Sequence, residues 1–112
     1  MSSTLFTPYK LGPVTLRNRT IRSAAFESMG KDFGPTRQLK DYHVAVARGG
    51  VGMTTLAYAA VCRSGLSFNK QLWLRPEIVP GLREITDAVH REGAAAAIQI
   101  GHCGNMTHLS LI

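Results

Sequence analysis

Three short runs of small, apolar and β-branched residues alternate with two segments of helical periodicity, and this alternation constrains the fold most. The runs span residues 20–25, 51–60 and 94–100. Almost no polar side chain interrupts them, which is typical of strands buried on both sides. The intervening segments repeat apolar residues at three- and four-residue spacing: Leu39, Tyr42, His43 and Val46 in the first, Ile78, Leu82, Ile85 and Val89 in the second. The sequence therefore predicts a β-α-β-α-β order and an α/β fold with a parallel sheet.

Helix ends and a hairpin complete the predicted elements. Thr36 is a candidate N-cap for the first helix, and Gly49-Gly50 would end it, because a positive φ favours glycine there. Before the repeating part, Tyr9–Leu16 contains two short alternating arms around Gly12-Pro13, which predicts a β-hairpin. The loop 62–75 is predicted to lack regular structure. A (β/α)8 barrel needs about 250 residues, so the chain is either a small three-stranded sheet or part of a barrel.

Charge and cysteine usage narrow the class of protein. Thirteen Lys and Arg against seven Asp and Glu give a formal charge of +6. These basic residues are spread along the chain with one small cluster at Arg17, Arg19 and Arg22, which does not favour nucleic-acid binding. Cys62 and Cys103 form no paired motif, and no apolar run is long enough for a membrane span or leader. We expect a cytoplasmic protein without nucleic-acid or membrane partners.

Polar and small residues follow each predicted strand, where a parallel fold places chemistry. Ser23–Phe26, Ala57–Ala59 and Gln99–His102 would meet at one rim, because the carboxyl ends of parallel strands lie together. Small residues let a flat ring approach the backbone, and the Gln99 amide both donates and accepts, which suits a heterocycle edge. Composition alone favours the alternative that these small residues pack helices on the sheet and that Gln99 caps a strand end.

Other candidate sites are weaker. His102, Cys103 and His108 do not match a zinc-ligand spacing, and neither cysteine has an assignable base that would make it a nucleophile. Tyr42 and His43 occupy core-facing helical positions and are predicted to pack. Residues 49–52 are glycine-rich but precede a strand, whereas a dinucleotide-binding loop would open a helix. We therefore expect neither a metal site nor a Rossmann cofactor site.

Several motifs, in order, resemble the start of the Old Yellow Enzyme family, the NADH:flavin oxidoreductases. They span nearly the whole chain: Leu5-Phe6-Thr7-Pro8, Leu11-Gly12, Leu16-Arg17-Asn18-Arg19, Gly49-Gly50-Val51-Gly52 and Ile98-Gln99-Ile100-Gly101-His102-Cys103-Gly104. The resemblance implies a single FMN-binding (β/α)8 TIM barrel, of which residues 1–112 are an incomplete N-terminal fragment. Within it, 1–18 would be an N-terminal segment and hairpin closing the barrel bottom, and 19–112 the first three strands, two helices and a following loop.

The same resemblance implies an activity and flavin contacts. Family members reduce FMN with NADH or NADPH and pass a hydride to an activated C=C, usually of an enone or enoyl compound. By position, the backbone at Ala24, Ala25 and Phe26 would line the flavin, Tyr58 would lie close to it, and Gln99 would hydrogen-bond its pyrimidine edge. Phe26 stands where many relatives have Thr or Cys, so the FMN is expected to be non-covalent.

The resemblance also implies what these residues lack. Relatives place their substrate-anchoring pair, proton-donating Tyr and FMN-phosphate site on later strands, so we expect no catalytic residue in this chain and no turnover by it alone. Asn105 stands where the family motif commonly has Arg, so that arginine's contact is not expected. The full-length form could be a homo-oligomer. The alternatives are a small non-enzymatic α/β domain or a fragment of another phosphate-binding barrel.

Overall fold

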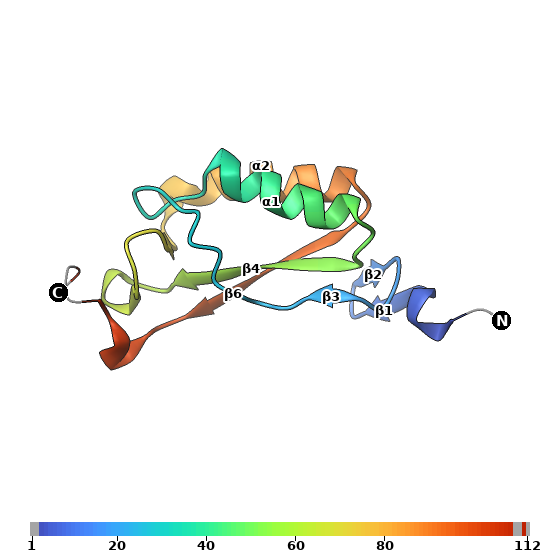
Figure 1. The fold of residues 1–112 in the computed structure, drawn as a ribbon, viewed down its shortest axis with the longest axis horizontal. Helices are drawn as coiled ribbons and strands as arrows, with labels where there is room; N and C mark the ends of the chain where they lie inside the picture. The colour runs from blue at the N-terminus through green and yellow to red at the C-terminus, as the bar shows by residue number, and fades with distance from the viewer. Residues whose placement is uncertain (1–2, 109–110, 112) are drawn as a thin grey trace.

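The computed structural model describes residues 3–108 and 111 (Figure 1). Two helices lie on one side of a parallel sheet, and a small hairpin lies near the amino ends of the strands (Figure 1). The strands are β1 Tyr9–Leu11, β2 Val14–Leu16, β3 Ile21–Arg22, β4 Met53–Ala60, β5 Leu72–Trp73 and β6 Ala95–Gly101. The α-helices are α1 Arg37–Arg48 and α2 Val79–Arg91, and short 3-10 helices occupy 4–6, 63–65, 76–78 and 104–106.

The hairpin forms where the sequence predicts it. β1 and β2 pair antiparallel, with Leu11 opposite Val14 and two residues between them. Gly12 has a φ of +57°, a conformation that suits glycine at the first central position of a tight hairpin turn. Beyond the hairpin, the Arg17 guanidinium donates to the backbone oxygens of Ala47, Val51 and Glu92. Arg17 therefore ties the hairpin to the ends of both helices.

β4 is the central strand of the sheet. All of its partners run parallel to it: β3 pairs with Met53 and Thr54, β5 with Ala59 and Ala60, and β6 with both parts of β4. The pairing with β6 shifts register between Leu56 and Ala59, where β4 contains one extra residue. β6 has a partner on one edge among the described residues, so the sheet is not a closed barrel.

The core lies between the helices and the sheet. Ile78, Ile85 and Val89 are buried against Leu56 and Ala59 of β4, and Leu82 is half-buried beside them, as the periodicity predicts. The Thr36 side chain accepts from the Leu39 amide and caps α1, and Gly50 has a φ of +109°, which confirms both predicted helix ends. The prediction for Tyr42 was wrong.

On α1 the buried residues are Leu39, His43 and Ala47, and Tyr42 is exposed. The buried residues are spaced four apart along α1, so its buried face includes Ala47 and leaves Tyr42 at the edge. The Arg22 guanidinium packs over the Tyr42 ring, with Cζ 5.0 Å from the ring centroid.

Three strand predictions need correction. The strand 94–100 was expected to be buried on both sides, but Gln99 and Ile100 of β6 are exposed and its other residues are half-buried, because the helices cover one side of the sheet. The first strand was expected over 20–25 with both faces buried, but β3 contains Ile21 and Arg22 alone, and Ile21 is exposed. β3 pairs with β4 on one edge, and its Arg22 side chain contacts Tyr42 of α1. The loop 62–75 was expected to lack regular structure, but it contains β5, whose two residues pair with the end of β4. Such short tertiary pairings leave no periodic signal in the sequence. No helix among the described residues could cross a membrane.

Candidate functional site

The carboxyl ends of β3, β4 and β6 lie at one end of the sheet, as the parallel pairing requires (Figure 1). Three connecting segments leave this rim: 23–36 after β3, 61–71 after β4 and 102–108 after β6. Parallel α/β folds place their ligands beyond the carboxyl ends of strands. The rim is therefore where the predicted site residues must be tested against geometry.

Tyr58 and Gln99 line one hollow at the rim. Its volume is about 310 Å³, and its wall comes from β4, β6 and the segment after β6: Tyr58, Gln99, Ile100, Gly101, His102, Cys103 and Met106. The hollow is open to solvent and mixes an amide, an imidazole and apolar surface. Two of the predicted residues from different strands thus share one concave surface.

Gln99 has a free amide. Its side chain is exposed and makes no hydrogen bond within the part of the chain that the structure describes. Gln71 is a useful contrast, because it is buried and fully engaged. Its oxygen accepts from the backbone amide and hydroxyl of Ser67, each at 2.6 Å, and its amide donates to the Tyr58 carbonyl at 3.2 Å. Gln71 stabilises the loop, whereas Gln99 retains its donors and acceptor for a ligand.

Tyr58 is held in place by its surroundings. Its hydroxyl donates to the Gly65 carbonyl at 3.0 Å, and its ring packs over Gly101 of β6. A Cβ at position 101 would lie 3.3 Å from the ring, closer than ordinary contact, so glycine allows this packing. The ring therefore forms a fixed wall beside Gln99.

The segment after β3 lies apart from this hollow. Ala24 is half-buried, Ala25 is exposed, and Phe26 is 40% exposed. The Phe26 ring stacks on Phe68 with centroids 5.8 Å apart and planes 15° from parallel. No hydrogen bond or ring contact among the described residues joins Phe26 to Tyr58 or Gln99. The two parts of the predicted site thus lie at the same rim and are not joined by a hydrogen bond or ring contact among the described residues.

Sequence reasoning missed a buried polar cluster beneath the rim. The Glu27 carboxylate accepts from His43 Nε2 at 2.8 Å and from the Ala57 amide at 3.2 Å, and it lies 3.3 Å from Arg22 Nη1. His43 is fully buried, as a packing residue should be, but both of its ring nitrogens are hydrogen-bonded. The sequence signal that could have indicated this cluster is Glu27 itself, an acidic residue among the mostly small and apolar residues 20–30.

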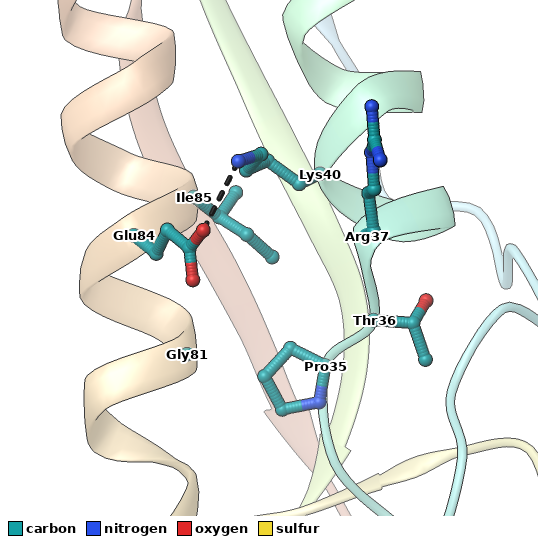
Figure 2. A pocket seen from close by; sticks show the side chains of 7 residues that line it. All are labelled: Pro35, Thr36, Arg37, Lys40, Gly81, Glu84 and Ile85. Carbon is teal, nitrogen blue, oxygen red and sulfur yellow. Dashed lines mark hydrogen bonds and ion pairs between the residues drawn. The ribbon is translucent and has the colours of Figure 1, made fainter.

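A second hollow lies between the two helices, on the helix side of the sheet (Figure 2). Its volume is about 170 Å³, and its residues come from the starts of α1 and α2. Figure 2 shows Lys40 reaching across it to Glu84, and this ion pair has an N···O distance of 3.0 Å. Its charges are already paired, so this hollow offers little to a ligand.

The histidines and cysteines near the rim make local contacts. The Cys103 thiol lies 3.1 Å from the Leu66 carbonyl and 2.9 Å from the Thr107 hydroxyl. His102 Nδ1 accepts from the Gly104 amide, and its Nε2 lies 3.3 Å from the Ser64 hydroxyl. Across residues 3–108 and 111, no three His, Cys, Asp or Glu side chains gather as metal ligands would.

A parallel β-α-β-α-β sheet with both helices on one side has the arrangement of an incomplete α/β barrel. Residues 4–111 match the model of the NADH:flavin oxidoreductase / NADH oxidase family, and the chain belongs to this family. The resemblance inferred from the motifs is thereby confirmed.

Individual relatives cover the same residues. The chain is 48% identical over 100 residues to a 4,4'-dithiodibutanoate disulfide reductase of Rhodococcus erythropolis, covering 89% of this chain and 25% of that protein. It is 38% identical over 106 residues to an NADPH dehydrogenase of Listeria welshimeri, covering 91% of this chain and 31% of that protein. The chain thus spans less than a third of each relative.

A solved structure confirms the fold. Morphinone reductase in complex with tetrahydroNAD matches with a TM-score of 0.83 and 25% identity, over 96% of this chain and 29% of that one. The elements described above are therefore part of a (β/α)8 barrel, as the α/β alternation and the motifs predict.

Proposed function

We propose that this chain forms one wall of an FMN site in an oxidoreductase that transfers a hydride from NADH or NADPH to an activated C=C of an enone or enoyl substrate. The observation that carries the proposal is the unpaired Gln99 amide in the rim hollow beside Tyr58. Family membership supports the flavin and the nicotinamide, since the family description names both. The morphinone reductase structure, with its bound tetrahydroNAD, supports the same reductant class.

The residues present fit a flavin edge. The Gln99 amide can donate to a ring carbonyl and accept from a ring N–H, the pattern of a pyrimidine edge. Ala24 and Ala25 leave their backbone accessible to a flat ring, and Phe26 offers no thiol for covalent attachment. The FMN would supply the acceptance and donation of hydride. The protein residues would fix its position and orientation.

The expectations for domain organisation, catalysis and partners follow from the small part of the barrel that the chain contains. We propose that residues 1–112 belong to one FMN-binding domain, with 1–18 as its hairpin segment and 19–112 as strands and helices of the barrel. No catalytic residue is assigned within them, so the isolated chain should bind FMN weakly and should not oxidise NADPH faster than free FMN does. The protein would act in the cytoplasm on a small unsaturated carbonyl compound, without nucleic-acid or membrane partners and with homo-oligomers as an option for the whole protein.

A titration of the ¹⁵N-labelled chain with FMN, followed by NMR, tests the proposal because it detects weak binding. We expect the Gln99 side-chain amide and the Tyr58, Ala24 and Ala25 backbone amides to shift in a saturable way. Gln99→Leu should weaken binding about tenfold, the loss expected when a hydrogen-bond donor and acceptor are removed together.

Gln38 provides the matched control. It is an exposed glutamine on α1, so Gln38→Leu should bind FMN as the wild-type chain does. Shifts that map to the hollow between the helices, or equal binding by Gln99→Leu and wild type, would contradict the proposed site. A cooperatively folded chain with no FMN-induced shift would favour the non-enzymatic alternative.

A further inference from the structure

The Glu27 carboxylate lies buried between the two parts of the proposed flavin site. Its side chain is 4% exposed, and it accepts from the Ala57 amide, from His43 Nε2 and from Arg22 Nη1. Phe26 immediately precedes Glu27, and Ala57 immediately precedes Tyr58. One carboxylate thus joins the segment after β3 to the rim end of β4.

Side chains replace a missing strand at this position. β3 pairs with β4 as far as Thr54, and β5 pairs from Ala59 onward. Between them, Arg22 Nη1 donates to the Thr55 carbonyl at 2.7 Å, and the Ala57 amide donates to Glu27. The β4 backbone is therefore satisfied by an arginine and a glutamate where a neighbouring strand would otherwise supply partners.

Arg22 also reaches back to its own segment. Its Nη2 donates to the Ala25 carbonyl at 3.2 Å, which fixes the chain between the strand and Phe26. The same guanidinium bonds the Glu27 carboxylate, so Arg22 and Glu27 anchor both ends of the stretch Ser23–Phe26. No regular secondary structure holds this stretch.

The contacts also define the protonation of His43. An ionised carboxylate only accepts hydrogen bonds, so His43 Nε2 must bear a proton and donate it to Glu27. Its Nδ1 lies 2.7 Å from the Thr54 hydroxyl, which can donate to it. His43 is completely buried, so its ring has no access to water as an alternative partner.

We propose that Glu27, with His43 behind it, is a positioning residue that fixes Ala24–Phe26 and Tyr58 relative to each other for the flavin. The proposal rests on the function proposed above. Glu27 does not touch the ligand; it acts through the Ala57 amide on one side and its own backbone on the other. Its replacement should disturb the rim while the helices and the core stay folded.

Glu27→Gln tests this with the shape of the side chain retained. One oxygen of the carboxylate becomes an NH₂ donor, which cannot face the Nε2–H of His43. In the wild-type chain Glu27 Oε1 lies 3.4 Å from the Ala57 amide nitrogen, and Oε2 accepts from Arg22 as well as facing His43. With its oxygen kept toward Ala57, Gln at position 27 would donate to His43 Nε2 and lose the contact with Arg22 Nη1. The His43 ring would then move its proton to Nδ1 and donate to Thr54. We expect ¹⁵N NMR to show protonated Nε2 in the wild-type chain and unprotonated Nε2 in Glu27→Gln.

The backbone supplies the second readout. In Glu27→Gln the Ala24, Ala25, Phe26 and Tyr58 amides should shift, and hydrogen-exchange protection at Ala57 should fall about tenfold, because a charged acceptor is replaced by a neutral one. Glu84→Gln is the matched control, since Glu84 lies on α2 in an exposed ion pair with Lys40. It should change none of these signals.

Thr54→Val separates positioning from general packing. It removes the partner of His43 Nδ1 and leaves the Glu27–Ala57 contact in place. If Glu27 positions the rim, Thr54→Val leaves the Ala24–Phe26 amides and Ala57 protection as in wild type. Equal disturbance by Thr54→Val and Glu27→Gln would overturn the proposal, as would an unchanged His43 ring and unchanged rim amides in Glu27→Gln.

FMN binding tests whether the positioning by Glu27 matters for the proposed function. Glu27→Gln should weaken FMN binding to the chain several-fold, and Glu84→Gln should not. The failure of the proposed function and the failure of the positioning role are distinguishable. A wild-type chain that does not respond to FMN contradicts the proposed function and removes the flavin from the positioning proposal. Intact FMN binding by Glu27→Gln, with the rim amides displaced, would overturn the positioning role while leaving the proposed function standing.

Discussion

At Gly52, nearby backbone atoms leave no room for a side chain. A Cβ at this position would lie 2.4 Å from the Asn18 carbonyl oxygen and 2.9 Å from the Thr20 carbonyl oxygen. The Gly52 amide also donates to the Thr20 oxygen at 3.0 Å, so the two segments cannot separate without losing that bond. The family motif at 49–52 therefore reflects the close approach of β4 to the segment before β3.

Gly52→Ala should lower the free energy of unfolding by about 2 kcal/mol or more, because the backbone must shift to admit a methyl group. Urea denaturation of the chain measures this. Gly49→Ala is the control: Gly49 has a φ of −71°, and its Cβ would meet the Val46 oxygen at 3.4 Å, an ordinary contact. Equal losses in the two variants would show that close approach does not explain the motif.

Residue-level reasoning nominated two residues that share the rim hollow, and it missed the carboxylate that lies beneath the rim. Tyr58 and Gln99 could be nominated because polar or aromatic residues near strand ends share a rim in any parallel fold. Glu27 could not be assigned, since its partners His43 and Ala57 lie 16 and 30 residues further along the chain. Burial of the carboxylate depends on α1 and β4 meeting over it, which local sequence does not encode.

At the scale of elements, helices were easier to predict than strands. α2 has a four-membered apolar repeat, and α1 has a side-chain cap at Thr36, so local signals suffice. β3 and β5 are two residues each, and their extent depends on how far their backbones pair with β4. The β3 pairing ends after Thr54, because the next backbone groups of β4 bond side chains. The Thr55 carbonyl accepts from Arg22, and the Ala57 amide donates to Glu27.

The ends of α1 and α2 are joined by a surface ion pair with a pH-dependent effect. Arg48 Nη2 donates to the Glu92 carboxylate at 2.9 Å, and this hydrogen bond lowers the pKa of Glu92 below its usual value. A carboxyl group whose pKa is lower in the folded chain stabilises the fold above its unfolded pKa, which is about 4.3 for Glu. That stabilisation is lost as the pH falls through the lowered pKa.

Glu92→Gln should therefore be less stable than the wild-type chain at pH 7, and the difference should shrink as the solution is acidified below about pH 4. Denaturant unfolding at several pH values, at low and high salt, measures it, and salt should reduce the difference as well. Glu77→Gln removes a carboxylate 3.8 Å from Arg75 and controls for the change in net charge. A difference that grows in acid would contradict the assignment.

For the whole molecule, the decisive feature is the uncovered side of the sheet. Both α-helices lie on one side, and no α-helix of residues 3–108 lies on the other (Figure 1). Large apolar side chains of the strands and rim segments stay exposed: Ile21, Phe26, Val61, Phe68, Ile100 and Met106. β6 has an unpaired edge among the described residues. In the barrel fold that the chain shares with its relatives, further strands and helices would cover such surfaces.

The isolated chain should therefore self-associate and bind hydrophobic dyes, because exposed apolar surface and an open strand edge favour association. Ile100 is 57% exposed on β6, so Ile100→Lys should reduce both effects and change the free energy of unfolding by less than about 0.5 kcal/mol. Sedimentation velocity over a concentration series measures this. Val79→Lys, at an exposed valine in the helix layer, should sediment as the wild-type chain does.

If the wild-type chain is monomeric at all concentrations and binds no dye, the uncovered side does not drive association, and the chain can be studied with FMN as a stable unit. If Ile100→Lys alone becomes monomeric, the association runs through β6. Because Ile100 also lines the Gln99 hollow, FMN titrations must then use the wild-type chain at concentrations below the association range.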